Sequence, residues 1–139
     1  MVTGSGRNIG RAIVLELAGR GANVTVNTRS NEAEANAVAK EAEDLGARAL
    51  AVIGDAADKA TVERMRAQAE ETFGGVDIYV SNAARRLYKD FFTITDDDWD
   101  HYLNQQLTAS WYLAKAFVPG MRDRGWGVAV RPPPKLSVG

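Results

Sequence analysis

The chain has 139 residues, of which 45% are hydrophobic and 25% charged, and its formal net charge is −1. This length supports one domain with one core, and the balanced charge argues against nucleic acid as a partner, because such binders carry a strongly basic face. The absence of cysteine excludes disulfides and thiolate metal sites and is typical of a reducing, cytoplasmic compartment. No apolar run approaches the ~18 residues that span a membrane, and no signal peptide is recognised, so no membrane partner is expected.

The first motif is a glycine-rich turn, TGSGRNIG at residues 3–10, between a short apolar segment, Met1-Val2, called the stub below, and a helical run at residues 9–20. Glycine lets the backbone approach an anion closely, and a helix N-terminus offers unpaired N–H groups at the positive end of its dipole. The turn therefore predicts a phosphate-binding site. The alternative is an ordinary glycine turn with no ligand.

Strand-like and helix-like segments alternate along the rest of the chain. We expect strands at residues 23–27, 48–53, 76–81 and 127–130, and helices at 31–45, 58–73 and 95–124. The apolar residues expected on their inward faces are Ala35, Val38, Ala42 and Leu45, then Val62, Met65, Ala69 and Phe73, then Trp99, Leu103, Leu107, Ala114, Phe117 and Met121. Strands separated by helices pair in parallel through right-handed crossovers, so the pattern predicts an α/β, Rossmann-like, doubly wound sheet.

The two ends of the chain depart from this pattern. Only three residues precede Gly4, whereas a strand usually has about 5–6 residues, and the first strand of this fold lies near the middle of the sheet. Three consecutive prolines at residues 132–134 cannot continue the last strand, because proline donates no ladder hydrogen bond. We therefore expect a partial dinucleotide-binding domain at residues 1–130, truncated at the first strand and after the fifth, and a Pro-rich mobile tail at residues 131–139.

Four landmarks together resemble the N-terminal half of the short-chain dehydrogenase/reductase family over about residues 2–130. They are the TGSGRNIG turn, Asp55 after the third strand, the SNAA segment at residues 81–84 and the helical segment at residues 99–127. The resemblance is greatest to carbonyl reductases similar to 3-oxoacyl-carrier-protein reductase. It implies a nicotinamide dinucleotide cofactor and a family reaction of carbonyl reduction or secondary alcohol oxidation. In the family the long helix helps to form a dimer interface, so we expect a homo-oligomer through residues 96–124.

The resemblance also assigns cofactor-binding positions. The phosphates would lie on the glycine-rich turn, at Gly4, Arg7, Asn8, Ile9 and Gly10. Asn8 stands where the family has glycine, and Asn is the residue after glycine that best tolerates a positive φ. Asp55 would accept a hydrogen bond from the adenine amino group, and Asn82 and Ala83 would lie at the cofactor ribose. The alternative for these three residues is that they only shape the turns after their strands.

The residues after the second strand decide between NAD and NADP. An acidic residue there accepts from the ribose 2′-hydroxyl, whereas a basic residue accommodates the 2′-phosphate of NADP. This chain has Arg29 and Ser30 and no carboxylate at that place, and Arg7 adds a second cation. The sequence therefore predicts NADP(H). The alternative is a pair of solvated arginines.

The family's catalytic residues have no counterpart in this sequence. The expected Tyr-x-x-x-Lys pair follows the fifth strand, but residues 131–139 contain no tyrosine, and no tyrosine elsewhere has a lysine four positions later. The serine partner is also missing, and the asparagine of the long helix is replaced by Gln106. We therefore expect no catalytic residue here. Two alternatives to an enzyme stay open: a non-catalytic nucleotide-binding module, and a truncated or frame-altered product without an evolved function.

Metal binding is not expected. The three aspartates at residues 96–98 lie in the first turn of a helix, where the helix dipole favours carboxylates. His101 is the single histidine and has no cysteine or second histidine at ligand spacing. Both features are more simply explained as parts of a helix surface.

Overall fold

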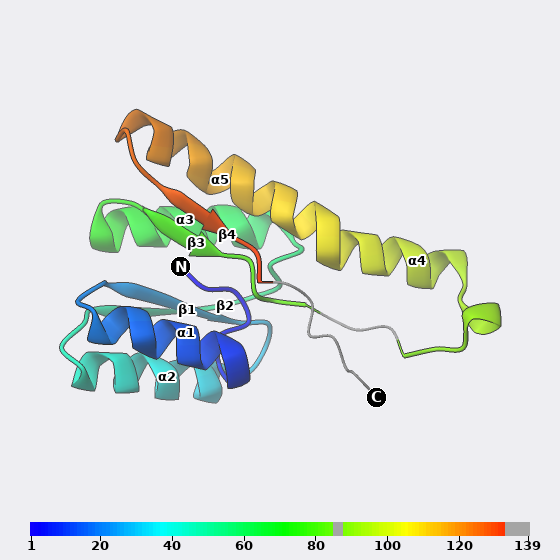
Figure 1. Cartoon of the computed structure of the whole chain (residues 1–139), viewed down its shortest axis with the longest axis horizontal. Helices are drawn as coiled ribbons and strands as arrows, with labels where there is room; N and C mark the ends of the chain where they lie inside the picture. The colour runs from blue at the N-terminus through cyan, green and yellow to red at the C-terminus, as the bar shows by residue number, and fades with distance from the viewer. Residues whose placement is uncertain (85–87, 133–139) are drawn as a thin grey trace.

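A computed structural model of the chain describes residues 1–84 and 88–132. Helices and strands alternate from the N-terminus, in two layers of helices around a sheet (Figure 1). The α-helices are α1 (Asn8–Gly19), α2 (Glu32–Asp44), α3 (Lys59–Phe73), α4 (Asp96–Leu103) and α5 (Ala109–Asp123), and the strands are β1 (Val24–Thr28), β2 (Ala49–Ile53), β3 (Ile78–Val80) and β4 (Val128–Val130). A short 3-10 helix, η1 (Phe91–Thr93), precedes α4, and a π-helical turn, η2 (Asn104–Thr108), joins α4 to α5.

All strand pairs are parallel, as the sequence predicts. β1 pairs with β2 and β3 pairs with β4, while Val2 bridges Val26 on one side and Val80 on the other. The stub therefore lies between the two pairs (Figure 1), and the strand order is β2, β1, stub, β3, β4. The amide of Val2 donates to the Thr25 carbonyl at 3.1 Å, and that of Thr3 donates to the Val80 carbonyl at 3.0 Å. The central position of a short first strand is thus confirmed.

The helices begin and end at residues that satisfy the free backbone groups of their terminal turns. Asn31, Asp58 and Thr95 each accept hydrogen bonds from the amides of the first turn of α2, α3 and α4 respectively. Gly74 ends α3 with a left-handed φ of 83°, a conformation that glycine adopts at little cost. These short-range signals explain why predicted and observed boundaries differ by only one or two residues.

Two hydrophobic clusters lie on the opposite faces of the sheet. α1 and α2 cover one face with residues that include Val14, Ala35 and Val38. α3 and α5 cover the other face, where Met65 and Leu113 are fully buried. The predicted inward face of α2 is correct except at Leu45, which is 53% exposed because it lies at the C-cap, beyond the last turn that faces the sheet.

The predicted inward face of the long helix is wrong in its first half. Trp99 and Leu107 are 57% and 64% exposed, because α4 extends away from the sheet and has no layer to pack on (Figure 1). The π turn adds one residue. It therefore rotates the side chains that follow by about 100° relative to the line of apolar side chains on α4. The buried line of α5 consists of Ala109, Leu113, Ala116, Phe117 and Met121.

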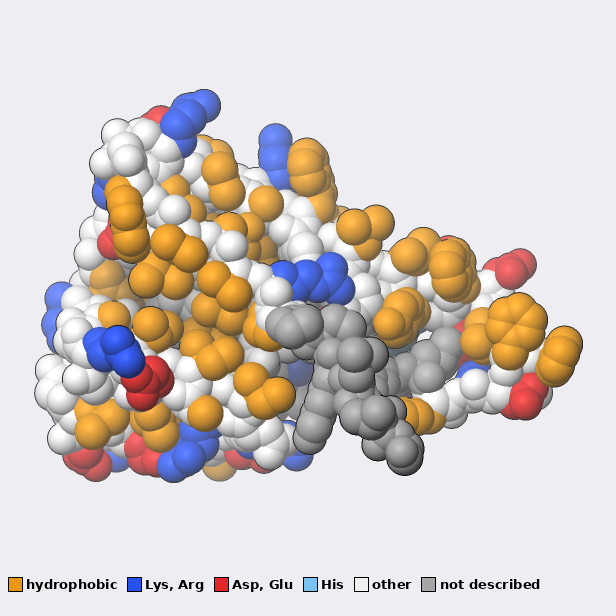
Figure 2. Space-filling model, viewed as in Figure 1, with side chains coloured by type: hydrophobic (Ala, Val, Ile, Leu, Met, Phe, Trp, Pro, Cys, Tyr) orange, Lys and Arg blue, Asp and Glu red, His pale blue; other side chains and the backbone are white. Residues whose placement is uncertain are grey.

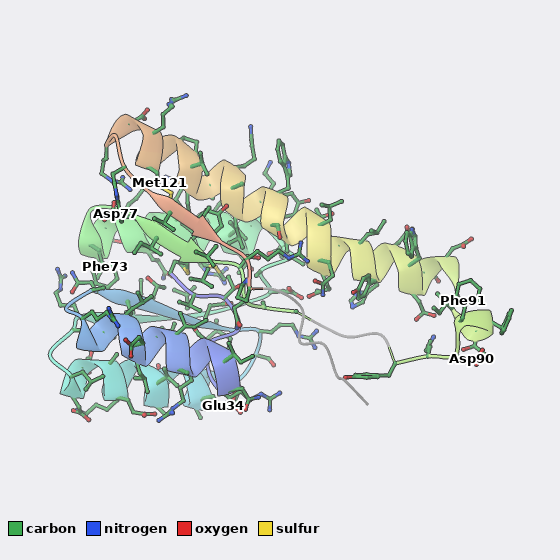
Figure 3. The ribbon with its side chains drawn as sticks, in the orientation of Figure 1. Glu34, Phe73, Asp77, Asp90, Phe91 and Met121 are labelled. Carbon is green, nitrogen blue, oxygen red and sulfur yellow. The ribbon has the colours of Figure 1, made fainter. Side chains whose placement is uncertain are left out.

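The projecting part of the chain exposes large apolar side chains. Phe91 and Phe92 in η1 are 78% and 91% exposed, and Trp111 in α5 is 61% exposed. Figure 2 shows hydrophobic side chains gathered along this projecting arm, which runs from η1 through α4 to the start of α5, and Figure 3 places Phe91 at its tip. In the described part of the chain, no helix is long and apolar enough to cross a membrane.

A cavity of about 230 Å³ lies beside Met1, between the amino ends of β1 and β3, where Val24 and Val76 contribute to its lining. The Met1 amino group is buried and donates to the Ile78 carbonyl at 3.0 Å. Burial lowers the pKa of this amino group to about 6, against a smaller opposing effect of Asp77. The cavity and this amino group lie at the amino ends of the strands, whereas the glycine-rich turn lies at the carboxyl ends.

Candidate cofactor-binding site

The predicted site residues follow the carboxyl ends of the parallel strands, which meet at one edge of the sheet. Gly4 follows the stub, Arg29 follows β1, Asp55 follows β2 and Asn82 follows β3. The chain winds from the stub to β1 on one side and reaches β3 on the other, so the strand order reverses at the stub. Ligands of open α/β sheets bind outside the carboxyl ends at such a reversal.

Asn27 attaches the glycine-rich turn to β1 and β2. Its side chain is 1% exposed; Oδ1 accepts from the Gly4 amide at 3.3 Å, and Nδ2 donates to the carbonyls of Val52 and Gly54, each at 3.0 Å. The Ser5 amide also donates to the Asn27 carbonyl at 2.7 Å. Buried polar groups need such partners, so Asn27 is a structural residue of the site. No motif in the sequence marks Asn27 as a site residue, and the available signal is an amide side chain at the end of an apolar strand.

Asn82 holds the other side of the turn. Its Nδ2 donates to the carbonyls of Thr3 at 2.9 Å and Gly4 at 3.0 Å. The amides of Asn82 and Ala83 both donate to the Thr3 hydroxyl, at 3.1 and 3.0 Å. Asn82 and Ala83 therefore lie beside the turn, and a contact of either residue with a cofactor ribose stays a prediction.

The backbone of the turn requires small residues. A Cβ on Gly10 would lie 2.4 Å from the Gly4 carbonyl oxygen and 2.6 Å from Nδ2 of Asn82. Asn8 has a φ of 51°, which confirms that Asn takes a left-handed conformation here. α1 begins at Asn8 and receives no side-chain cap from Arg7, so no capping side chain of Arg7 competes with an anion for the first N–H groups of the helix. These features fit the phosphates of a dinucleotide.

The charged residues around the turn are of both signs. Arg7, Ile9, Arg29 and Ser30 are exposed at this edge of the sheet. Glu34 is near the end of α2 that faces the turn (Figure 3), and its Oε2 would lie 3.1 Å from a Cβ on Gly6. An incoming phosphate would thus meet two arginines and one carboxylate.

Asp55 is held from two directions. Its Oδ1 accepts from the Ala57 amide at 2.8 Å, and its Oδ2 accepts from Nε2 of Gln105 at 3.2 Å. Gln105 belongs to the π turn, fifty positions later in the chain. Gln105 was not among the predicted site residues, because no local pattern connects the end of β2 with a helix so far along the chain.

Gln106, which the resemblance predicts to stand in place of the family's asparagine, lies near the end of β4. Its Oε1 accepts from Nη2 of Arg131 at 2.8 Å, and its carbonyl accepts from the Ser110 hydroxyl at 3.0 Å. Arg131 and Pro132 are the only described residues of the predicted tail, and residues 133–139 lie outside the described part.

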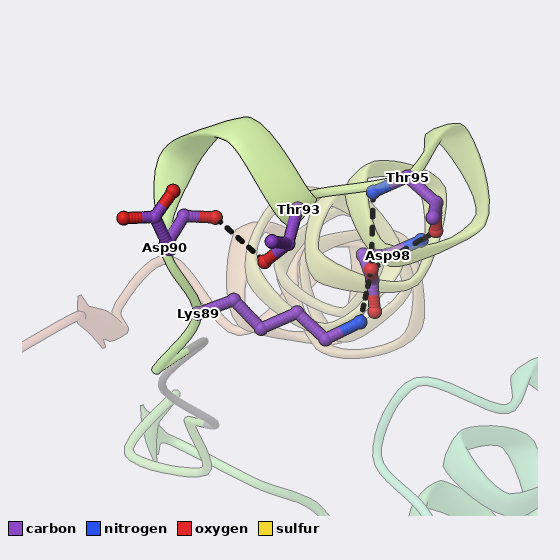
Figure 4. Close-up of polar contacts among 5 residues, drawn as sticks. All are labelled: Lys89, Asp90, Thr93, Thr95 and Asp98. Atoms are coloured by element: carbon purple, nitrogen blue, oxygen red, sulfur yellow. Dashed lines mark hydrogen bonds and ion pairs between the residues drawn. The ribbon is translucent and has the colours of Figure 1, made fainter.

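The three aspartates at residues 96–98 form a helix start. Asp98 accepts from the Thr95 amide and hydroxyl and pairs with Lys89, as Figure 4 shows. The hydrogen bonds from Lys89 and Thr95 lower the pKa of Asp98 to about 2. Among the described residues, no group of three or more His, Asp or Glu side chains is arranged to hold a metal ion.

Known proteins share this sequence and fold. The chain is 38% identical over 125 residues to a hydroxynaphthalene reductase-like protein of Metarhizium brunneum, covering 90% of this chain and 47% of that protein. It is 35% identical to an L-rhamnose 1-dehydrogenase (NAD(P)(+)) of Sphingomonas, covering 94% and 51%. The structure of L-sorbose reductase from Gluconobacter frateurii, complexed with NADPH and L-sorbose, superimposes with a TM-score of 0.88 at 32% identity, covering 94% and 50%.

The chain spans about half the length of the curated relatives it matches. The family described as short chain dehydrogenase matches residues 1–131, nearly the whole chain. The parallel sheet, the glycine-rich turn at its point of reversal and this match agree with one another. The chain belongs to the short-chain dehydrogenase family.

Proposed function

We propose that this chain is the NADP(H)-binding part of a short-chain dehydrogenase/reductase. The observation that carries the proposal is the glycine-rich turn, which Asn27 and Asn82 hold open at the carboxyl edge of the sheet. The solved L-sorbose reductase complexed with NADPH has a similar fold and supports a nicotinamide dinucleotide as the ligand.

Different residues around the turn would bind different parts of the cofactor. The first amides of α1 and the residues from Gly4 to Gly10 would hold the pyrophosphate. Arg29 and Ser30, with Arg7 nearby, would hold the 2′-phosphate, since an arginine fork matches phosphate oxygens and no carboxylate follows β1 directly. When bound, the cofactor supplies or accepts a hydride.

We propose that the family reaction, carbonyl reduction or secondary alcohol oxidation, needs residues beyond these 139. The sequence contains no Tyr-x-x-x-Lys pair, and by the resemblance Gln106 would stand in place of the family's asparagine. Binding of the dinucleotide is therefore the activity proposed for this chain itself. We further propose a cytoplasmic location, from the cysteine-free composition.

The test is a fluorescence titration of the 139-residue chain with NADPH and with NADH. We expect tighter binding of NADPH, and loss of this preference in Arg29→Asp, because a hydrogen bond to a charged group contributes about 1.5–3 kcal/mol. Arg20→Asp is the matched control, since Arg20 is exposed at the other end of α1. Equal affinities for the two nucleotides, unaltered by Arg29→Asp, would contradict the choice of NADP(H).

We also propose that two copies associate through residues 96–124. The support is the exposed apolar arm, on which Trp99 and Trp111 are each more than half exposed. Contiguous exposed apolar side chains of this kind mark protein interfaces. Light scattering should show a dimer that Trp111→Glu weakens, and a monomer at high concentration would contradict the proposal.

A further inference from the structure

The contact between Gln105 and Asp55 connects the π turn with the end of β2. Nε2 of Gln105 lies 3.2 Å from Oδ2 and 3.4 Å from Oδ1 of Asp55. Both residues are partly exposed, so the pair borders solvent at the carboxyl edge of the sheet. An ionised carboxylate only accepts hydrogen bonds, and therefore the amide nitrogen of Gln105 must face it.

The hydrogen bond from Gln105 restricts rotation of the Asp55 carboxylate about its last side-chain bond. Oδ1 is already held by the Ala57 amide at 2.8 Å, and Gln105 adds a donor on Oδ2 at 3.2 Å. Each carboxylate oxygen can accept about two hydrogen bonds, so each oxygen keeps one acceptor position after these two donors are bound. The two donors fix the direction in which the remaining positions point. Among the described residues, the Ala57 amide alone would hold the Asp55 carboxylate without Gln105, and Oδ2 would lose its donor.

The neighbouring residue cannot do the same. Consecutive positions of a helix point about 100° apart, and Gln106 extends to Arg131 after β4 instead. The π turn thus sends two adjacent amide side chains to the ends of two different strands. Such turns are frequent at functional sites.

We propose that Gln105 orients the Asp55 carboxylate for the amino group of the cofactor's adenine, and so sets the preference for adenine over a base with a carbonyl oxygen at that place. The inference rests on the proposed function and on the adenine position that the resemblance to the family assigns to Asp55. An amino group donates to a fixed carboxylate, whereas a carbonyl oxygen repels it. Gln105 is accordingly a positioning residue that acts through Asp55.

The test compares dissociation constants of the 139-residue chain for NADPH and for its deamino analogue, in which hypoxanthine replaces adenine. The wild type should prefer NADPH, and Gln105→Leu should reduce this preference about tenfold, as expected for weakening one hydrogen bond to a charged group. Asp55→Asn should reduce it as well. Asn104→Leu, an amide lost from the same π turn, is the matched control and should keep the wild-type preference.

Base preference is a readout that a general loss of structure would not move, since unfolding weakens both ligands equally. A preference in Gln105→Leu equal to that of the wild type would overturn the inference, and so would an equal reduction in Asn104→Leu. Binding of neither dinucleotide by the wild type would overturn the proposed function together with the inference. Binding of NADPH with no role of Gln105 in base preference would overturn the inference alone.

Discussion

The buried amino group of Met1 makes the stability of this chain depend on pH in a defined direction. The nitrogen lies between β1 and β3 at the amino ends of these strands, and donates to the Ile78 carbonyl at 3.0 Å. Burial disfavours the charged form and lowers the pKa of the amino group from 8.0 to about 6.

The magnitude follows from this difference. Two pKa units, from 8.0 to about 6, correspond to roughly 2.7 kcal/mol at about 1.36 kcal/mol for each unit. The unfolded chain binds the proton more tightly, so the free energy of unfolding rises with pH between about 6 and 8. The stabilisation is complete above the unfolded pKa and is lost as the pH falls to the folded one.

Urea unfolding of the chain at a series of pH values from 5.5 to 8.5 measures this dependence. The control is the same chain with Met1 acetylated, which keeps the N–H donor to Ile78 but carries no charge. All other titrating groups are shared, so the difference between the two chains isolates the amino group. A difference that stays constant between pH 6 and pH 8 would refute the reasoning.

Three further predictions concern the core, the turn and the chemistry. Leu113→Ala should lower the free energy of unfolding by about 2–5 kcal/mol in urea titrations, because a fully buried leucine leaves a cavity; Val118→Ala, at an exposed position of α5, should change it little. Glu34→Gln should tighten NADPH binding about fivefold, since roughly 1 kcal/mol of repulsion near the turn is removed, whereas Glu32→Gln should have a smaller effect; weaker binding in Glu34→Gln would contradict this. The 139-residue chain should not oxidise NADPH with simple ketones at a family-like rate, because a positioned acid alone contributes about 10²–10⁴-fold; robust turnover by a sample of confirmed mass would disprove it.

Local signals were sufficient to predict most of the fold. The helix caps at Asp58 and Thr95 and the helix end at Gly74 depend on a few neighbouring residues, and each is found where the sequence predicts it. The alternation of strands with helices likewise fixes parallel pairing, because the connections are too long for hairpins. The predicted buried face of the long helix was wrong because the prediction assumes a constant helical repeat, which η2 interrupts.

The supporting contacts of the site were not predictable in the same way. Asn27, Asn82 and Gln105 each contact a residue at least 23 positions away, at the end of a different strand. Such contacts depend on strand order and register, which the spacing of residues along the chain does not contain. The exposed groups of the turn could be predicted, but the buried amides that hold them could not.

The glycine-rich turn is held in place although only Met1-Val2 form the central segment of the sheet. The free energy of unfolding and the affinity for NADPH therefore depend on different ends of the strands. Thr3 and Gly4 are held by Asn27 and Asn82, which lie at the carboxyl ends of the neighbouring strands. The cavity and the buried amino group lie at the opposite, amino ends. Since only the carboxyl ends carry the turn, the charge buried at Met1 lowers the stability of the whole sheet without changing the geometry of the turn. Acetylation of Met1 should therefore raise the free energy of unfolding near neutral pH and leave the NADPH dissociation constant of the folded chain unchanged.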